Sequence, residues 1–254
     1  MGKRIKKFFA KYWATALIYL ALIFLYVFMT SSGKANSYLF PEAGQIWKAF
    51  TENRELMLIN MLSSFKLMIP SVTLSLIIAI SLGTLMGMND RIRDALHPVI
   101  YTFSVIPSIL LSPFALLLAS SFWTASLFLI VYGTLWSTLF ATITGIMTID
   151  KRYLDKARTL QLTGLKKLTK VILPAAIPSI IAGFINSLRS TFVMLVYAEM
   201  YGSKYGMGFF VKKYADFGLY DYTWAGFIFM VIVLVIVMQL FEALKKYLLR
   251  WTVD

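Results

Sequence analysis

The sequence contains no cysteine and one histidine, His97. The absence of cysteine excludes a disulfide framework, a thiolate metal site and a cysteine nucleophile. A single histidine argues against a zinc enzyme and against a serine–histidine catalytic apparatus. The GxxxxGK[ST] phosphate-binding loop is also missing, because Gly2-Lys3 and Gly33-Lys34 lack both the upstream glycine and the following hydroxyl residue. We therefore expect no catalytic residue, metal or cofactor in this chain.

Charged residues are scarce at 15%, and 25 Lys and Arg stand against 12 Asp and Glu. Apolar residues make up 59% of the 254 residues and the mean hydropathy is +0.74, whereas soluble domains are about 45–50% apolar. The basic residues lie at the ends of apolar segments, which disfavours nucleic acid as a partner. The composition predicts an all-α protein that crosses a lipid bilayer several times.

Six apolar segments are long enough to cross a bilayer, which takes about 20 residues per helix. They are residues 12–30, 57–88, 99–119, 125–147, 175–198 and 224–244. The first exceeds the apolar part of a signal peptide, and Ser32-Gly33-Lys34 is a poor cleavage site, so we interpret it as a retained helix. The second is expected to tilt or protrude; the alternative is two short helices broken at Pro70. We divide the chain into residues 1–56, a first helix with an external segment, and a five-helix core, 57–254.

The distribution of basic residues predicts the orientation. Seventeen Lys and Arg lie in the N-terminal stretch, the loops after spans two and four, and the C-terminal stretch, against six in the remaining loops. Both termini are therefore expected in the cytoplasm. The remaining two, Lys66 and Arg189, lie within spans.

The cytoplasmic loop from Thr148 to Leu173 is basic yet periodic. Apolar residues near helical spacing predict an amphipathic helix over about residues 150–165, with Asp150 as its N-cap: Leu154, Ala157, Leu160, Leu162, Leu165 and Leu168. Such a helix either lies on anionic lipid or binds a cytoplasmic partner, and composition leaves both readings open.

Polar residues within the spans are candidates for a translocation pathway. Ser104, Ser108 and Ser112 recur at every fourth position of span three, and Asn186 and Ser190 do so on span five. Small hydroxyl residues also serve helix–helix contacts, so both roles are open. Arg189 either attracts an anionic substrate or pairs with a carboxylate or a helix C-terminus. Lys66 either takes part in substrate binding or extends to the interface.

The external stretch from Glu199 to Thr223 is rich in glycine and aromatic residues, which predicts a compact segment that re-enters the protein or docks a partner. Gly202, Gly206 and Gly208 mark expected tight turns. Glu199 either helps an outer gate and docking surface or joins a hydrogen-bond network.

Several motifs resemble those of permeases of binding-protein-dependent ABC importers. Asp155-Lys156-Ala157 followed by Val171-Ile172-Leu173-Pro174 is similar to their signature of Glu-Ala-Ala, three residues, Gly, nine residues and Ile-x-Leu-Pro, with Gln161 at the glycine position. The block Glu199 to Phe209, Ile106-Pro107 with Pro113, and Ser63 with Lys66 resemble motifs of the nitrate/sulfonate/taurine subfamily. The resemblance runs from about Pro41 to Trp251.

The resemblance implies a type I importer (MetI-like) fold in the bacterial plasma membrane. It implies a second permease copy, forming a homodimer, two cytoplasmic ATPases that use ATP and Mg²⁺, and an external binding protein or lipoprotein. The ATPases would grip a coupling helix whose residues are Asp155, Lys156, Ala157, Arg158, Thr159, Leu160 and Gln161, with the exit at Leu173 and Pro174. The expected cargo is a small organic anion, such as a sulfonate, taurine or nitrate-like solute, or a vitamin precursor. The rival functions are a secondary transporter or a channel not driven by ATP, and a membrane-embedded enzyme.

Overall fold

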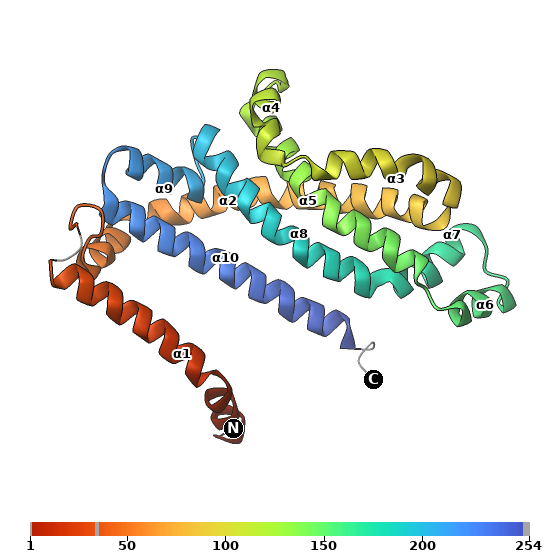
Figure 1. The fold of residues 1–254 in the computed structure, drawn as a ribbon, viewed down its shortest axis with the longest axis horizontal. Coiled ribbons are helices and arrows are strands. Elements are labelled where there is room, and N and C mark those ends of the chain that lie inside the picture. The colour runs from red at the N-terminus through yellow and green to blue at the C-terminus, as the bar shows by residue number, and fades with distance from the viewer. Residues whose placement is uncertain (1, 34–35, 251–254) are drawn as a thin grey trace.

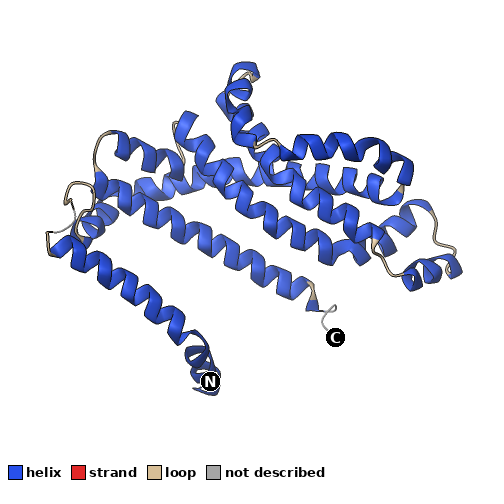
Figure 2. Cartoon of the chain, viewed as in Figure 1, coloured by secondary structure: helices blue, strands red, loops and turns tan. Residues whose placement is uncertain are grey.

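The computed structural model describes residues 2–33 and 36–250, with side chains from residue 13 onward, and this part of the chain is helical without a β-strand (Figures 1 and 2). Its elements are, in order, α1 (Gly2–Ser31), α2 (Ala43–Met88), α3 (Asp90–Val105), the 3₁₀ helix η1 (Ser108–Leu111), α4 (Ser112–Leu118), α5 (Phe122–Met147), α6 (Lys151–Thr159), α7 (Gly164–Lys167), the π-helix η2 (Leu168–Ile172), α8 (Leu173–Gly202), α9 (Met207–Asp216) and α10 (Tyr220–Leu248).

The expected all-α membrane architecture is confirmed. Five helical segments are long and apolar enough to cross a bilayer, namely α1, α2, α5, the run from α7 through α8, and α10. The pair formed by α3 and the segment Ser108–Leu118 makes a sixth candidate. Five of the expected spans lie inside single helices, namely α1, α2, α5, α8 and α10.

Helix α2 is continuous over 46 residues although Pro70 lies inside it, so the alternative of two helices broken at Pro70 is wrong. Around the proline, Ser71 Oγ donates to the Leu67 carbonyl at 2.8 Å and Thr73 Oγ1 donates to the Ile69 carbonyl at 2.8 Å. Proline within a membrane helix is tolerated when neighbouring groups satisfy the backbone. Because α2 begins at Ala43, the expected division after residue 56 falls inside this helix.

The third span is not the straight helix expected over residues 99–119. The chain turns by 83° between α3 and the segment Ser108–Leu118. Proline disfavours the α conformation in the residue before it, and Ile106 is extended at φ −74°, ψ 117° ahead of Pro107. Ser104 and Ser108 therefore stand on different helices, so the prediction of one polar stripe along span three is wrong.

Helix α5 lies at the centre of the bundle, between α2 and α8. Its polar contacts with α8 are between hydroxyl groups: Thr138 Oγ1 lies 2.8 Å from Ser187 Oγ, and Thr134 Oγ1 lies 3.0 Å from Thr191 Oγ1. All four side chains are buried. Small residues and interhelical hydroxyl bonds are the means by which membrane helices pack without a hydrophobic driving force.

The two ends of the bundle differ. Helix α6 lies at one end, while α9 and the connection between α1 and α2 lie at the other (Figure 1). At the α9 end the Trp224 indole nitrogen donates to the Leu39 carbonyl at 3.0 Å, and the Tyr26 hydroxyl donates to the Pro41 carbonyl at 2.8 Å. From these contacts α1 and α10 both run away from the α9 end, so the start of α1 and the end of α10 are directed toward the α6 side (Figure 1).

Candidate functional site

Helix α6 occupies the connection between α5 and α8, and its start is fixed by Asp150. The Asp150 carboxylate accepts hydrogen bonds from the Arg152 backbone nitrogen at 2.8 Å and from the Arg152 guanidinium at 2.7 Å. The side-chain bond from Arg152, followed by the backbone bond, lowers the pKa of Asp150 below its ordinary value. The predicted N-cap is therefore confirmed, and its charge complements the positive end of the helix.

The helix is shorter than the expected range of about 150–165, because it ends at Thr159. The Leu162 nitrogen donates to the Ala157 carbonyl and the Gln161 nitrogen donates to the Arg158 carbonyl, both at 2.9 Å. This pair of bonds is the Schellman motif, which terminates a helix. Of the expected stripe, Leu165 and Leu168 consequently belong to α7 and η2.

Gln161 is the one non-glycine residue with positive φ in the described part of the chain, at +52°. It stands where the permease signature carries glycine, and the Schellman motif requires a left-handed residue at this position. The left-handed conformation costs an L-residue about 1–2 kcal/mol. The departure from the signature therefore leaves the turn intact and adds local strain.

Replacing Gln161 tests this conclusion. We expect Gln161→Gly to leave the turn in place and raise stability by up to about 1 kcal/mol, since glycine relieves the left-handed strain but adds chain entropy when unfolded. Gln161→Val should lower stability, because a β-branched residue is a strong outlier at positive φ. Thermal unfolding of the purified protein in detergent measures both, and equal stability of the two variants would contradict the assigned turn.

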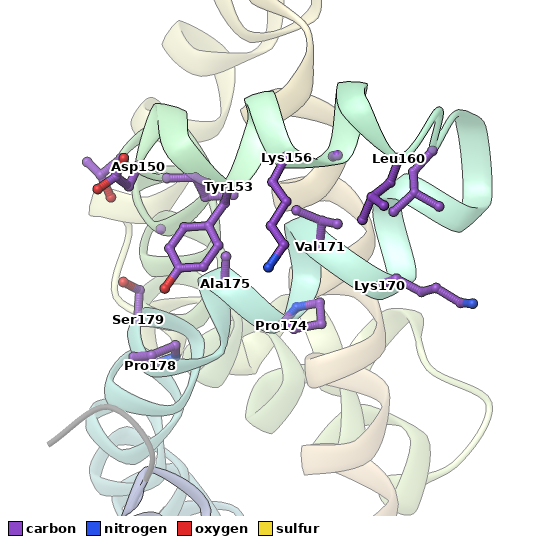
Figure 3. Close-up of a pocket in the computed structure, with 15 residues that line it drawn as sticks. Asp150, Tyr153, Lys156, Leu160, Lys170, Val171, Pro174, Ala175, Pro178 and Ser179 are labelled. Carbon is purple, nitrogen blue, oxygen red and sulfur yellow. The ribbon is translucent and has the colours of Figure 1, made fainter. Parts of the chain in front are cut away.

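A cavity of about 780 Å³ lies between α6 and the start of α8. Of the proposed coupling residues, Lys156, Ala157, Leu160 and Pro174 line it, and Figure 3 shows Lys156 directed toward Pro174. Ala157 is 1% exposed, so it packs α6 against the rest of the chain. Leu173 is half-buried at the start of α8.

The remaining coupling residues lie on the outer side of α6. Asp155 and Arg158 form an exposed ion pair at 3.2 Å, and the Thr159 hydroxyl donates to the Asp155 carbonyl. Large apolar side chains are exposed on and beside this helix, with Tyr153 at 54%, Leu160 at 60% and Leu165 at 74%. Exposed apolar residues among basic ones suit a partner or a lipid surface.

At the opposite end, three buried side chains cap the N-terminus of α9. The Gly206 nitrogen donates to Asn60 Oδ1 at 2.8 Å, the Met207 nitrogen to Ser64 Oγ at 2.9 Å, and the Gly208 nitrogen to Glu199 Oε2 at 2.8 Å. The first amides of a helix have no partner within it, and carboxylates are favoured there. Helices α2, α8 and α9 are thereby held at one junction, which we call the α9 cap.

The glycines of this segment have different roles. Gly206 has φ +125° and ψ 158°, a backbone region open essentially to glycine alone, so the predicted turn is observed at this position. Gly202 and Gly208 are instead sites of close approach, because a Cβ would meet the Phe122 ring at 1.7 Å and the Val196 carbonyl at 2.6 Å.

Asn60 and Ser64 were not predicted as functional residues from the sequence. They stand four residues apart in an apolar segment, and this spacing places them on one helix face. Their shared helix face could be recognised in the sequence. That this face contacts the backbone at residue 206 follows only from the fold.

The proposed pathway residues separate into two groups. A cavity of about 450 Å³ at the α3–α4 bend is lined by Ser104, Ser108, Arg189 and Ser190. Ser112 and Asn186 lie outside this cavity: Ser112 Oγ is 3.1 Å from the Tyr197 hydroxyl, and Asn186 is exposed on α8. On α8, Asn186, Arg189 and Ser190 share one exposed face near mid-span.

In the described part of the chain no group of three or more His, Asp or Glu side chains is placed to hold a metal ion.

Comparison with known sequences places this chain among transport proteins. The family model for "binding-protein-dependent transport system inner membrane component" matches residues 72–253. A putative aliphatic sulfonates transport permease of Bacillus subtilis is 28% identical over 174 residues, covering 68% of this chain and 63% of that protein. A bicarbonate transport system permease of Synechococcus elongatus is 31% identical over 140 residues, covering 55% of this chain and 50% of that protein.

A nitrate import permease of Leptolyngbya laminosa is 30% identical over 135 residues, covering 53% of this chain and 48% of that protein. The chain thus spans less than two thirds of the length of these relatives. Among solved structures, the inward-facing MetNI methionine ABC transporter matches with a TM-score of 0.62 and 16% identity, covering 79% of this chain and 98% of the matched one. An amino acid ABC transporter matches with a TM-score of 0.54 and 16% identity, over 79% of this chain and 95% of that one.

The structural likeness establishes the MetI-like fold, and the family model covers more than half of the chain. The chain belongs to the family of binding-protein-dependent transport system inner membrane components and is a multi-pass protein of the bacterial plasma membrane.

Proposed function

We propose that this chain is the membrane-spanning permease subunit of an ATP-driven importer. It provides the pathway for a small solute that an external binding protein delivers. Its relatives are named as permeases for sulfonates, nitrate and bicarbonate, and an organic or inorganic anion of this kind is the proposed cargo, with a vitamin precursor as the alternative.

The observation that carries the proposal is the position and surface of α6. This helix stands at the end of the bundle opposite α9 (Figure 1), and basic residues flank its exposed Tyr153 and Leu160. It contacts η2, which continues directly into α8, and Ala157 and Pro174 line the same cavity. A displacement of α6 is therefore passed to a membrane-spanning helix. We propose that two cytoplasmic ATPases, which bind ATP and Mg²⁺, each grip one copy of α6.

A second permease copy completes the pathway in this proposal. The polar face of α8 around Arg189 is exposed near the middle of a 30-residue helix. An ionised side chain facing lipid at that depth is unfavourable, and such residues face a protein interior or a water-filled cavity. A copy of the same chain against this face, as a homodimer, would enclose the cavity at the α3–α4 bend. Both termini and α6 would then lie in the cytoplasm and α9 outside, where the binding protein or lipoprotein docks.

Two states with different affinities are needed for such a cycle. Nucleotide and substrate must favour different conformations of the transporter, one open to the cytoplasm and one open to the outside. A ligand that binds both conformations with equal affinity does not shift the equilibrium between them. Helix α6 biases the cytoplasmic end of α8, and the α9 cap joins the outer end of the same helix through Glu199. Movement of α8 as a rigid element would couple the two ends.

Purification and uptake assays test the function. The tagged permease, expressed with its candidate ATPase and binding protein, should copurify with the ATPase and import solute into proteoliposomes only when ATP is present. A secondary transporter or channel would move solute along an ion gradient or concentration gradient without ATP. Uptake that is independent of both ATP and the ATPase would reject the importer in favour of that alternative.

A further inference from the structure

The cavity at the α3–α4 bend contains an isolated positive charge. Arg189 lines it, and in the described part of the chain no carboxylate forms an ion pair with its guanidinium. At 1.5 Å per residue, Arg189 lies about 24 Å from the start of α8 and about 20 Å from its end. No Asp or Glu is among the residues that line this cavity. The charge at this depth is therefore left for a mobile ligand.

Three other residues that line this cavity carry hydrogen-bond donors without partners within the described ranges. The Trp136 indole N–H is buried without an acceptor among the described residues, and Trp136 lines the same cavity. The hydroxyl groups of Ser108 and Ser190, which also line it, take part in no hydrogen bond in the described part of the chain. In contrast, Ser104 and Tyr132 already donate, to the carbonyls of Tyr101 and Phe103. Within the part of the chain that the structure describes, the groups left without a partner in this cavity are therefore one indole N–H and two hydroxyl groups, which can donate hydrogen bonds, and one guanidinium cation.

The shape of the site depends on the bend and on one glycine. Pro107 ends α3 and directs Ser108 toward α5 and α8, where a Cβ on Gly133 would meet Ser108 Oγ at 2.8 Å and Met194 Cγ at 2.9 Å. The volume of about 450 Å³ accommodates a small solute. A guanidinium presents its donors as a planar fork that matches the oxygens of an oxyanion.

From this arrangement we propose that the cavity is an anion-recognising site inside the permease, which takes a small solute carrying one negatively charged oxyanion group and rejects its neutral analogue. The group is a sulfonate, a nitrate or a carboxylate-type anion such as hydrogencarbonate. Arg189 binds the oxyanion, and Trp136, Ser108 and Ser190 add donors. The role of this site in transport rests on the proposed function, namely that the chain is the permease of an importer. The inference adds that the permease itself, besides the binding protein, selects the charge of the cargo.

Binding to the full-length permease in lipid nanodiscs, without the ATPase, the binding protein or ATP, tests the site. The probes are sodium ethanesulfonate and ethyl methyl sulfone, a neutral molecule of similar size, with tryptophan fluorescence as the readout. We expect a saturable response to ethanesulfonate, none to the sulfone, and loss of the response in Trp136→Phe. A parallel titration with sodium hydrogencarbonate shows which oxyanion binds more tightly.

Variants at position 189 separate the contribution of the positive charge to anion binding from that of the shape of the guanidinium group. Arg189→Gln should weaken ethanesulfonate binding about tenfold or more, since it removes a charge-assisted bond, and Arg189→Lys should give an intermediate affinity. Arg54→Gln is the matched control, because it also replaces an arginine by glutamine, at an exposed position of α2 that does not line this cavity, and it should bind like the wild type. Gly133→Leu should also weaken binding by filling the site.

A response to the sulfone equal to that to ethanesulfonate, no response of the wild type to either anion, or unchanged binding in Arg189→Gln would overturn the proposal. The binding readout requires neither ATP hydrolysis nor the ATPase. A failure to copurify with the ATPase therefore counts against the proposed function alone, and a failure to bind the anion counts against this site alone.

Discussion

Ala157→Glu is expected to abolish most ATP-driven uptake while ATP hydrolysis by the complex continues. Ala157 is 1% exposed and is the buried residue of α6, so the larger acidic side chain has to displace α6 from its position against the rest of the chain. Overfilling a packed site costs about 1–3 kcal/mol, which corresponds to about a 5- to 150-fold smaller population of the seated helix. Uptake into proteoliposomes and phosphate release, measured on the same preparation, give the ratio of solute moved per ATP.

The size of the side chain separates this effect from a general loss of folding. Ala157→Ser adds one oxygen and should keep the wild-type ratio of uptake to hydrolysis. Membrane insertion and the elution volume of the Ala157→Glu permease should match those of the wild type, since α6 lies outside the spans. Full uptake by Ala157→Glu would count against α6 as the element that moves α8.

Gly206→Ala is expected to lower the stability of the protein strongly. At φ +125° and ψ 158° the backbone conformation is available essentially to glycine. The added Cβ would also lie 2.3 Å from Cδ of the Glu199 carboxylate. Together these effects should cost about 3 kcal/mol or more, a fall in Tm of about 6–12 °C for a chain of this size.

Gly44→Ala supplies the matched comparison. Gly44 lies in the first turn of α2 with nothing within 4 Å of an added Cβ and no positive φ, so alanine there should leave Tm unchanged or raise it slightly. If the two variants melt at the same temperature, the α9 cap is not built as described. Glu199→Gln is a further check, because it keeps the shape of the side chain but replaces the carboxyl group whose Oε2 accepts a hydrogen bond from the Gly208 amide.

The spans were predictable because each is a long apolar run that folds within itself. Residues 125–147 and 224–244 lie inside α5 and α10, since a helix satisfies its own backbone groups in lipid and needs no distant partner. The bend of span three was present in the sequence as Ile106-Pro107, but its direction depends on the packing of Ser112 and Ser108 against α5 and α8.

The ends of short elements were less accessible. The apolar stripe suggested a helix to residue 165, whereas the Schellman bonds close it at Thr159. The sequence signal for that turn was weak because Gln161 replaces glycine at the left-handed position. Likewise, the contact of Asn60 with the Gly206 nitrogen joins residues 146 positions apart, and no local pattern contains that separation.

Labelling of single cysteines is the most direct test of the claim that α6 lies in the cytoplasm and is bound by an ATPase. The chain has no native cysteine, so Leu160→Cys, at a position 60% exposed, carries the only thiol of the permease. We predict that a membrane-impermeant maleimide labels it in inside-out vesicles, that bound ATPase protects it, and that Tyr205→Cys reacts only in right-side-out vesicles. Reaction of Leu160→Cys from the outside, or equal labelling with and without the ATPase, would contradict the account.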